Sequence, residues 1–309
     1  MNKYIRIMRI DHWIKQTFII PGIVMGIVLL DAPVDSSMLF RILIGFACSC
    51  AVASSNYVIN EWLDAEFDKY HPFKKHRSVV ENNMNKYIVF TMYFSLSVIG
   101  ILPGILISFP FFLMLLWLWI MGILYNVKPF RTKDIAYLDV LTESLNNAIR
   151  LLLGWFIVTD SFVPPVSIVL GYWLTGAFLM STKRFSEYRM IGDKSVAEKY
   201  RKSFRYYSQT SLLISSVFYG MLTVLFIGIF LIKYRIELIL FMPFFIGLFC
   251  YYLAISFKKD SAVQSPEKLY REKGLMIYLG GLLILFIILM KVDIPLLGIF
   301  TREELLKIW

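Results

Sequence analysis

The sequence predicts an all-α integral membrane protein with nine transmembrane helices. Hydrophobic residues make up 58% of the 309-residue chain and charged residues only 17%, and the mean hydropathy is +0.65. This composition excludes a soluble globular domain and is typical of helical proteins that cross a bilayer several times. No long polar linker interrupts the chain, so residues 1–309 are predicted to form a single membrane domain.

Apolar stretches long enough to cross the hydrocarbon core recur along the chain. The nine predicted spans are residues 14–30, 39–63, 87–108, 109–126, 136–158, 165–183, 210–233, 237–256 and 274–291. Pro21 is expected to kink the first span, because proline removes a helical hydrogen bond. A tight turn around Pro110 is expected to join the third and fourth spans.

The distribution of basic residues predicts the orientation of the chain. Most of the 32 Lys and Arg residues lie in alternate loops, and loops rich in these residues face the cytoplasm. The N-terminus is therefore predicted to be cytoplasmic and the C-terminus extracytoplasmic, in the inner (plasma) membrane. The loops at 64–86, 127–135, 184–209 and 257–273 would share the cytoplasmic face. The same bias accounts for the net charge of +10, so no nucleic-acid partner is predicted.

Oxygen ligands stack along one helix face at the end of the second span. Asn60, Asp64 and Asp68 are spaced by four residues, which places them on one side of a helix over two turns. Mg²⁺ usually takes one or two protein carboxylates and completes its shell with waters and substrate phosphates. Basic residues between His71 and Arg77 would receive the rest of a phosphorylated ligand. The alternative is a helix end that runs into a solvated charged loop, but ionisable groups at membrane depth are usually functional.

The fifth span carries a second group of polar residues. Asp139, Glu143 and Asn146 share a helix face, and Asn147 and Arg150 lie beside them. A span with this many polar groups is expected to turn them toward the bundle interior or a wet cavity. For the two asparagines, an internal polar network that holds the helices in register is an equal alternative.

Basic residues also mark the cytoplasmic ends of the sixth and first spans. Lys183, Arg184 and Glu187 lie within one helical turn. Lys15 either holds a lipid phosphate or anchors the first span at the membrane interface. Between residues 193 and 207, apolar and basic residues separate onto different helix faces. That pattern predicts an amphipathic helix lying on anionic lipid.

These residues resemble the motifs of the UbiA superfamily of intramembrane prenyltransferases. The superfamily's first motif, NDxxDxxxD, is matched by Asn60-Glu61-x-x-Asp64-x-x-x-Asp68, with Glu61 in place of Asp. Within the superfamily, the chain is most similar to decaprenyl-phosphate phosphoribosyltransferases (polyprenyl-phosphate 5-phosphoribosyltransferases). This likeness rests on Asp68-x-x-His71-Pro72-x-Lys74-x-x-Arg77, Trp13-Ile14-Lys15 and Lys183-Arg184-x-x-Glu187.

The resemblance implies a central cavity that opens toward lipid and holds Mg²⁺-pyrophosphate at its cytoplasmic mouth. The implied reaction transfers 5-phosphoribosyl from phosphoribosyl pyrophosphate to a polyprenyl phosphate and releases pyrophosphate, for the synthesis of cell-envelope glycan precursors. The implied catalytic residues are Asn60, Glu61, Asp64 and Asp68, and the implied metal ligands are Asp64, Asp68 and Asn60. The implied donor-phosphate residues are Lys74, Arg77, Tyr125, Lys133 and Arg150. The implied lipid-phosphate residues are Lys15, Lys183, Arg184 and Glu187.

Two other functions compete with phosphoribosyl transfer. Ordinary superfamily members move a prenyl group from a prenyl diphosphate to an aromatic acceptor, and their second motif is also acidic. Here the corresponding place has Lys183 and Arg184 with only Glu187, which suits a bare phosphate better than a second metal. An ion-coupled transporter is the alternative of another class. It is disfavoured because the chain shows no internal repeat and its acidic cluster sits at one membrane face.

Overall fold

The computed structural model describes residues 3–69, 76–258, 261–264 and 266–301. Within these ranges the ordered elements are all helices, with no strand. The chain divides into two compact units. The first comprises Met1–Pro164 and Ile191–Ser211, and the second comprises Pro165–Met190 and Leu212–Trp309.

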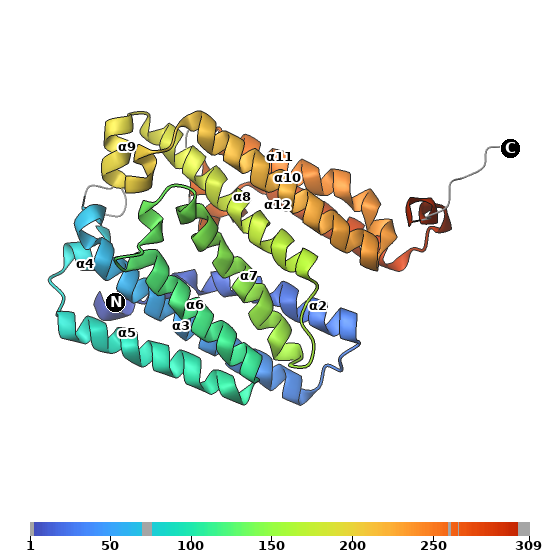
Figure 1. Ribbon diagram of the computed structural model, residues 1–309, viewed down its shortest axis with the longest axis horizontal. Helices are drawn as coiled ribbons and strands as arrows, with labels where there is room; N and C mark the ends of the chain where they lie inside the picture. Colours follow the sequence, from blue (N-terminus) through green and yellow to red (C-terminus); the bar gives the residue numbers. More distant parts are fainter. Residues whose placement is uncertain (1–2, 70–75, 259–260, 265, 302–309) are drawn as a thin grey trace. The chain divides into compact units, whose positions relative to one another are not determined.

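The first unit is built from the N-terminal half of the chain (Figure 1). Its elements are α1 (Lys3–Ile7), η1 (Ile10–Ile19), α2 (Ile20–Leu30), α3 (Ser36–Asp68), α4 (Ser78–Glu81), α5 (Lys86–Ile101), η3 (Leu102–Leu106), α6 (Phe109–Asn126), η4 (Thr132–Asp134), α7 (Leu138–Val158), α9 (Lys194–Tyr200) and η5 (Lys202–Arg205). The elements of the second unit are α8 (Val166–Ile191), α10 (Gln209–Tyr234), η6 (Ile236–Phe241), α11 (Met242–Ser256), η7 (Ala262–Gln264), η8 (Pro266–Arg271), α12 (Lys273–Lys291) and η9 (Pro295–Thr301).

Seven helices in the described part of the chain are long and apolar enough to cross a membrane. They are Lys3–Leu30, Ser36–Glu66, Lys86–Leu106, Phe109–Asn126, Gln209–Tyr234, Ile236–Ser256 and Lys273–Lys291. The protein is therefore an all-α, multi-helix membrane protein, as the composition predicts. The predicted spans 136–158 and 165–183 correspond to α7 and α8, which carry several polar residues. Nine spans, a single membrane domain and a cytoplasmic N-terminus stay predictions.

The first transmembrane segment changes its helix type close to the proline that was expected to distort it. Residues Ile10–Ile19 form a 3₁₀ helix, and the α-helix begins at Ile20, so Pro21 lies in the first turn of α2. Proline suits that position because the first amide groups of a helix have no intrahelical acceptor. Arg9, the residue before this 3₁₀ helix, has a positive φ of 51°.

Two glycines allow α2 and α7 to approach closely. A Cβ atom on Gly22 would lie 2.0 Å from the Leu151 carbonyl oxygen, and one on Gly154 would lie 2.0 Å from the Ile19 carbonyl oxygen. Small residues at helix crossings are common in membrane proteins, where close backbone packing replaces the hydrophobic effect as the driving force. This crossing holds η1 and α2 against the polar part of α7.

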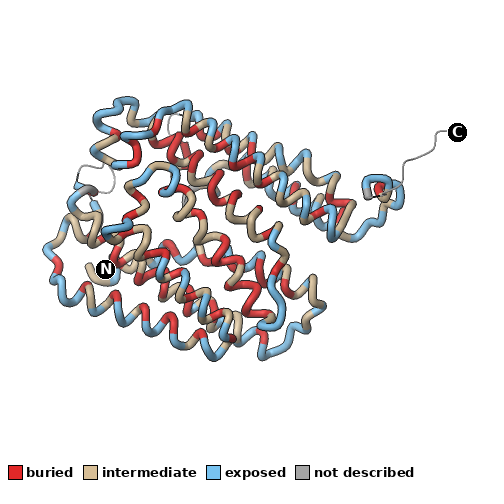
Figure 2. The backbone as a smooth tube through the Cα atoms, in the orientation of Figure 1, coloured by how far each residue is buried: buried red, intermediate tan, exposed pale blue. Residues whose placement is uncertain are grey.

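Apolar side chains occupy both the inside and the outside of the helices. Phe111, Leu115, Ile149 and Leu153 are fully buried in the core of the first unit. Exposed stretches run along the outer sides of the helices (Figure 2), and many of their side chains are large and apolar, such as Leu43. Exposed apolar surface of this extent fits a protein surrounded by lipid rather than water.

The segment after α8 differs from its sequence-based prediction. The amphipathic helix expected over 193–207 ends at Tyr200, and a short 3₁₀ turn follows. Phe204 and Tyr207, which were expected to lie on lipid, are buried inside the protein. That part of the prediction is wrong, because a buried carboxylate of α7, Asp139, accepts hydrogen bonds from Ser203 and Tyr207 and anchors the segment.

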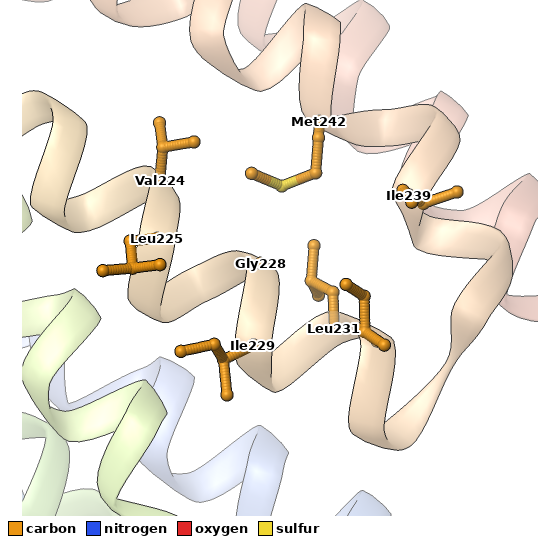
Figure 3. A pocket seen from close by; sticks show the side chains of 8 residues that line it. Val224, Leu225, Gly228, Ile229, Leu231, Ile239 and Met242 are labelled. Atoms are coloured by element: carbon orange, nitrogen blue, oxygen red, sulfur yellow. The ribbon is translucent and has the colours of Figure 1, made fainter. Parts of the chain in front are cut away.

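The second unit contains an apolar groove of about 290 Å³. Figure 3 shows that side chains of α10, η6 and α11 surround it. Its lining residues are Val224, Leu225, Gly228, Ile229, Leu231, Ile232, Ile239 and Met242. A groove with no polar side chain cannot hold a phosphate or a metal ion, so it cannot be the site of phosphate chemistry.

Candidate active site

The last turns of α3 bring the predicted metal ligands together on one face. The Asn60 amide donates a hydrogen bond to the Asp64 carboxylate over 3.3 Å. Asn60 also contacts the side chain of Asn126, the last residue of α6. Asp64 and Asp68 are largely shielded from solvent, with side-chain exposures of 17% and 7%. The helical spacing read from the sequence thus places two carboxylates and an amide side by side.

A loop between α6 and α7 supplies two cations to Asp64. The Lys133 ammonium lies 2.5 Å from Asp64 Oδ1, and the Arg131 guanidinium lies 2.9 Å from the same oxygen. Lys133 was predicted to be a donor-phosphate residue, whereas Arg131 was not assigned a role in the site. Burial of the Lys133 ammonium lowers its pKa to about 8, although the Asp64 carboxylate works in the opposite direction.

Independent contacts hold these two cations in place. Arg131 donates to the Asn126 carbonyl oxygen over 3.0 Å and to Asp134 over 3.1 Å. Lys133 donates to the Asn126 side-chain oxygen over 2.8 Å. Arg131 also has a positive φ of 32°, a conformation uncommon outside glycine. The loop is therefore shaped to direct both cations toward the end of α3.

A second ion pair forms at Asp68. Arg77 lies at the N-cap position of α4, and its guanidinium is 2.5 Å from Asp68 Oδ2. Glu61 is buried and accepts a hydrogen bond from the Val79 amide over 3.4 Å. Its carboxylate is thus engaged with α4, the helix that carries Arg77 at its start. Lys74, predicted to act beside Arg77, lies outside the described residues.

The oxygen ligands suit a hard divalent cation such as Mg²⁺. Asp64 and Asp68 carry negative charge, and each already faces at least one side-chain cation. Within the described ranges, no group of three or more His, Cys, Asp and Glu side chains could enclose a metal ion. Mg²⁺ usually binds to proteins through one or two carboxylates and completes its shell with waters and substrate phosphates, so two carboxylates are enough for such a site.

Tyr125 connects this site to the segment after α8. Its hydroxyl donates to Glu143 over 2.8 Å and accepts from Arg201 over 2.9 Å. Its ring centroid lies 5.9 Å from the Lys133 ammonium. The structure therefore places Tyr125 beside Lys133, and the binding of donor phosphates by these two residues stays a prediction. Arg201 was predicted only as one of the basic residues of the amphipathic helix expected over 193–207.

Arg150 lies among polar groups deeper in the first unit. It donates to Gln16 and to Asn147, each over 3.1 Å. Asn147 therefore contributes to an internal polar network, which was one of its two predicted roles. The assignment of Arg150 to the donor phosphate remains a prediction. Lys15 is half-buried one position before Gln16.

The predicted lipid-phosphate residues of α8 form a cluster of their own. Arg184 is buried and its guanidinium lies 3.2 Å from Glu187, while Lys183 lies 4.0 Å from the same carboxylate. Two cations thus share one carboxylate within a helical turn. These residues belong to the second unit, and their part in a common site with Asp64 stays a prediction.

Sequence reasoning assigned no role in this site to three residues that surround the predicted ones: Arg131, Asn126 and Arg201. Asn126 could have been found, because it is a polar residue at the end of an otherwise apolar span. Arg131 lies two positions before Lys133 and follows no periodic pattern. Its contact with Asp64 joins residues that are 67 positions apart.

Comparison with known proteins gives matches over most of the chain. A structure of a UbiA homolog from Archaeoglobus fulgidus bound to DMAPP and Mg²⁺ is 18% identical, with a TM-score of 0.69, covering 91% of this chain and 99% of that one. The same homolog bound to GPP and Mg²⁺ is 20% identical, with a TM-score of 0.67 and the same coverage. A digeranylgeranylglyceryl phosphate synthase structure is 17% identical, with a TM-score of 0.64, covering 91% of this chain and 97% of that one.

These similarities establish a UbiA-like fold. No curated protein matches the chain. The UbiA prenyltransferase family, however, matches residues 18–288, which include all of the described site residues except Lys15. The chain therefore belongs to the UbiA prenyltransferase family and is a transferase enzyme.

Proposed function

We propose that the enzyme transfers 5-phosphoribosyl from phosphoribosyl pyrophosphate to a polyprenyl phosphate, with release of pyrophosphate. The observation that carries this proposal over other family reactions is the cluster on α8. Two cations and one carboxylate lie in one turn of this helix, with Lys183 4.0 Å and Arg184 3.2 Å from Glu187. Cationic side chains suit the phosphate of a lipid acceptor, whereas a second bound metal would require more carboxylates.

The reaction forms one bond and breaks one bond at ribose C1. An oxygen of the polyprenyl phosphate attacks C1, while the bond between C1 and the pyrophosphate oxygen breaks and its electron pair leaves with pyrophosphate. A bound Mg²⁺ would neutralise charge that develops on the leaving pyrophosphate. The acceptor phosphate is already an anion at neutral pH, so no general base is needed. Catalysis then depends on positioning and electrostatic stabilisation.

The residues take distinct roles in this scheme. Asp64, Asp68 and Asn60 hold the metal. Glu61 keeps α4 in position through its bond to the Val79 amide.

The donor phosphates are bound by Arg77, Tyr125 and Lys133, together with Lys74 and Arg150. The lipid phosphate is bound by Lys15, Lys183, Arg184 and Glu187. The site faces the cytoplasm, so that the water-soluble phosphoribosyl pyrophosphate can reach it from the aqueous side.

A direct assay tests this function. Purified enzyme in detergent is incubated with radiolabelled phosphoribosyl pyrophosphate, Mg²⁺ and a panel of polyprenyl phosphates. Label is expected to move into the organic phase with a polyprenyl phosphate, and chelation of Mg²⁺ should abolish the transfer. A reaction without acceptor gives the background.

Prenyl transfer to an aromatic acceptor is the second candidate. It is supported by the structural neighbours that bind DMAPP or GPP with Mg²⁺. A parallel reaction with a prenyl diphosphate and an aromatic acid distinguishes the two. A prenylated aromatic product, with no transfer from phosphoribosyl pyrophosphate, would show that the phosphoribosyl proposal is wrong.

A further inference from the structure

Each of the two carboxylates proposed as metal ligands faces a cation that could instead bind phosphate. Asp64 is paired with Lys133 and Arg131, and Asp68 is paired with Arg77. Each of the two carboxylates is therefore already compensated by at least one side-chain cation. A divalent cation alone would have to displace these cations from the carboxylates. A diphosphate alone would have to bind the cations while the carboxylates remain close to it.

A metal ion and a diphosphate that arrive together avoid both conflicts. The metal can take the carboxylates while the phosphate oxygens take the side-chain cations. Every charge then exchanges one partner of opposite sign for another, and no buried charge is left without compensation. Binding of either ligand alone leaves such a charge, so the two ligands should favour each other's binding.

The loop is built so that its cations can leave Asp64 without losing their positions. Arg131 keeps its bonds to the Asn126 carbonyl oxygen and to Asp134, and Lys133 keeps its bond to the Asn126 side chain. Only their contacts with Asp64 need to change. Two preorganised cations beside two carboxylates thus form a site for a charged pair of ligands.

We propose that Arg131, Lys133 and Arg77 are exchangeable counter-ions of the two carboxylates, which makes binding of the divalent cation and of the donor diphosphate mutually dependent. Arg131 thereby becomes a further diphosphate-binding residue. The inference rests on the proposed Mg²⁺-diphosphate site, but it holds for either a phosphoribosyl or a prenyl donor. It can therefore be tested without turnover.

Binding of Mn²⁺, a paramagnetic substitute for Mg²⁺, tests the exchange in purified full-length protein. Electron paramagnetic resonance measures Mn²⁺ affinity with and without inorganic pyrophosphate, and calorimetry measures pyrophosphate affinity without metal. The affinity of the protein for pyrophosphate-bound Mn²⁺ should exceed its affinity for free Mn²⁺ at least tenfold, after correction for complex formation in solution. Equal affinities in the wild-type protein would overturn the proposal.

Lys133→Gln provides the sharper test, because it is expected to change the two affinities in opposite directions. Free Mn²⁺ should bind about tenfold more tightly, since a competitor for Asp64 is gone. Metal-free pyrophosphate should bind about tenfold more weakly, since a phosphate ligand is gone. Arg131→Gln should behave in the same way, and Arg77→Gln tests the pair at Asp68.

A matched control separates this effect from a general loss of positive charge. Lys128 is an exposed lysine of the same loop, and Lys128→Gln should leave both affinities within about twofold. If Lys133→Gln and Arg131→Gln both remain folded by size-exclusion chromatography but weaken both ligands, the cations are structural and the proposal fails. If the enzyme uses only prenyl diphosphates while the opposite changes are seen, the exchange stands and only the phosphoribosyl assignment falls.

Discussion

Asp139 is expected to hold the segment after α8 against α7, and Asp139→Asn tests this. The carboxylate is fully buried. It accepts hydrogen bonds from Tyr207 over 2.8 Å and from Ser203 over 3.1 Å, and it lies 3.5 Å from Arg201. The substitution preserves the shape of the side chain but removes its charge and turns one acceptor into a donor.

The size of the effect follows from these contacts. Each hydrogen bond to the carboxylate would lose its charge assistance, about 1 kcal/mol. The substitution also removes the anion that faces Arg201, and breaking a buried ion pair costs about 3–5 kcal/mol. The Arg201 contact is long, and its guanidinium is also bonded to Tyr125. We therefore expect the ion pair to contribute only about 1 kcal/mol, below that range, and the total destabilisation to be about 3 kcal/mol.

Two measurements check this expectation. Unfolding by sodium dodecyl sulfate in mixed micelles gives the change in stability, and limited proteolysis reports whether residues 194–207 have detached. Asp160→Asn is the control, because Asp160 is an exposed carboxylate in a loop. Unchanged stability together with unchanged protease resistance in Asp139→Asn would refute the reasoning.

Four further outcomes are expected. Asp64→Asn and Asp68→Asn should each abolish turnover while the yield of folded protein stays near wild type; activity that persists without divalent cation would contradict the metal role. Arg184→Ala should raise KM for the polyprenyl phosphate about ten- to a hundredfold and much less for the donor; the reverse pattern would mean that the two anion sites are exchanged. Gly154→Leu should prevent stable folding, because its side chain would meet the Ile19 carbonyl, and normal thermal stability would refute the close crossing. A thiol introduced by Lys75→Cys should react with an impermeant reagent only from the cytoplasmic side, and labelling only from outside would reverse the topology.

Several properties follow from the sequence because they depend on local periodicity. Long apolar stretches predict membrane helices, and the described part of the chain contains seven that meet the requirements for length and composition. A spacing of four residues is enough to predict that Asn60 and Asp64 share a helix face, and the two side chains are hydrogen-bonded. The motif around them was also sufficient to identify the UbiA family.

The charge balance of the site was decided only by the tertiary structure. Lys133 meets Asp64 across 69 positions of sequence, and Asp139 meets Tyr207 across 68. Neither contact has a periodic signature, because each depends on how a loop turns after its helix has ended. Local pattern placed Phe204 and Tyr207 on lipid, whereas a buried carboxylate on another helix drew their segment into the protein. Helix faces follow from spacing along one segment, but the partner of a buried charge is set by the folding of distant segments around it.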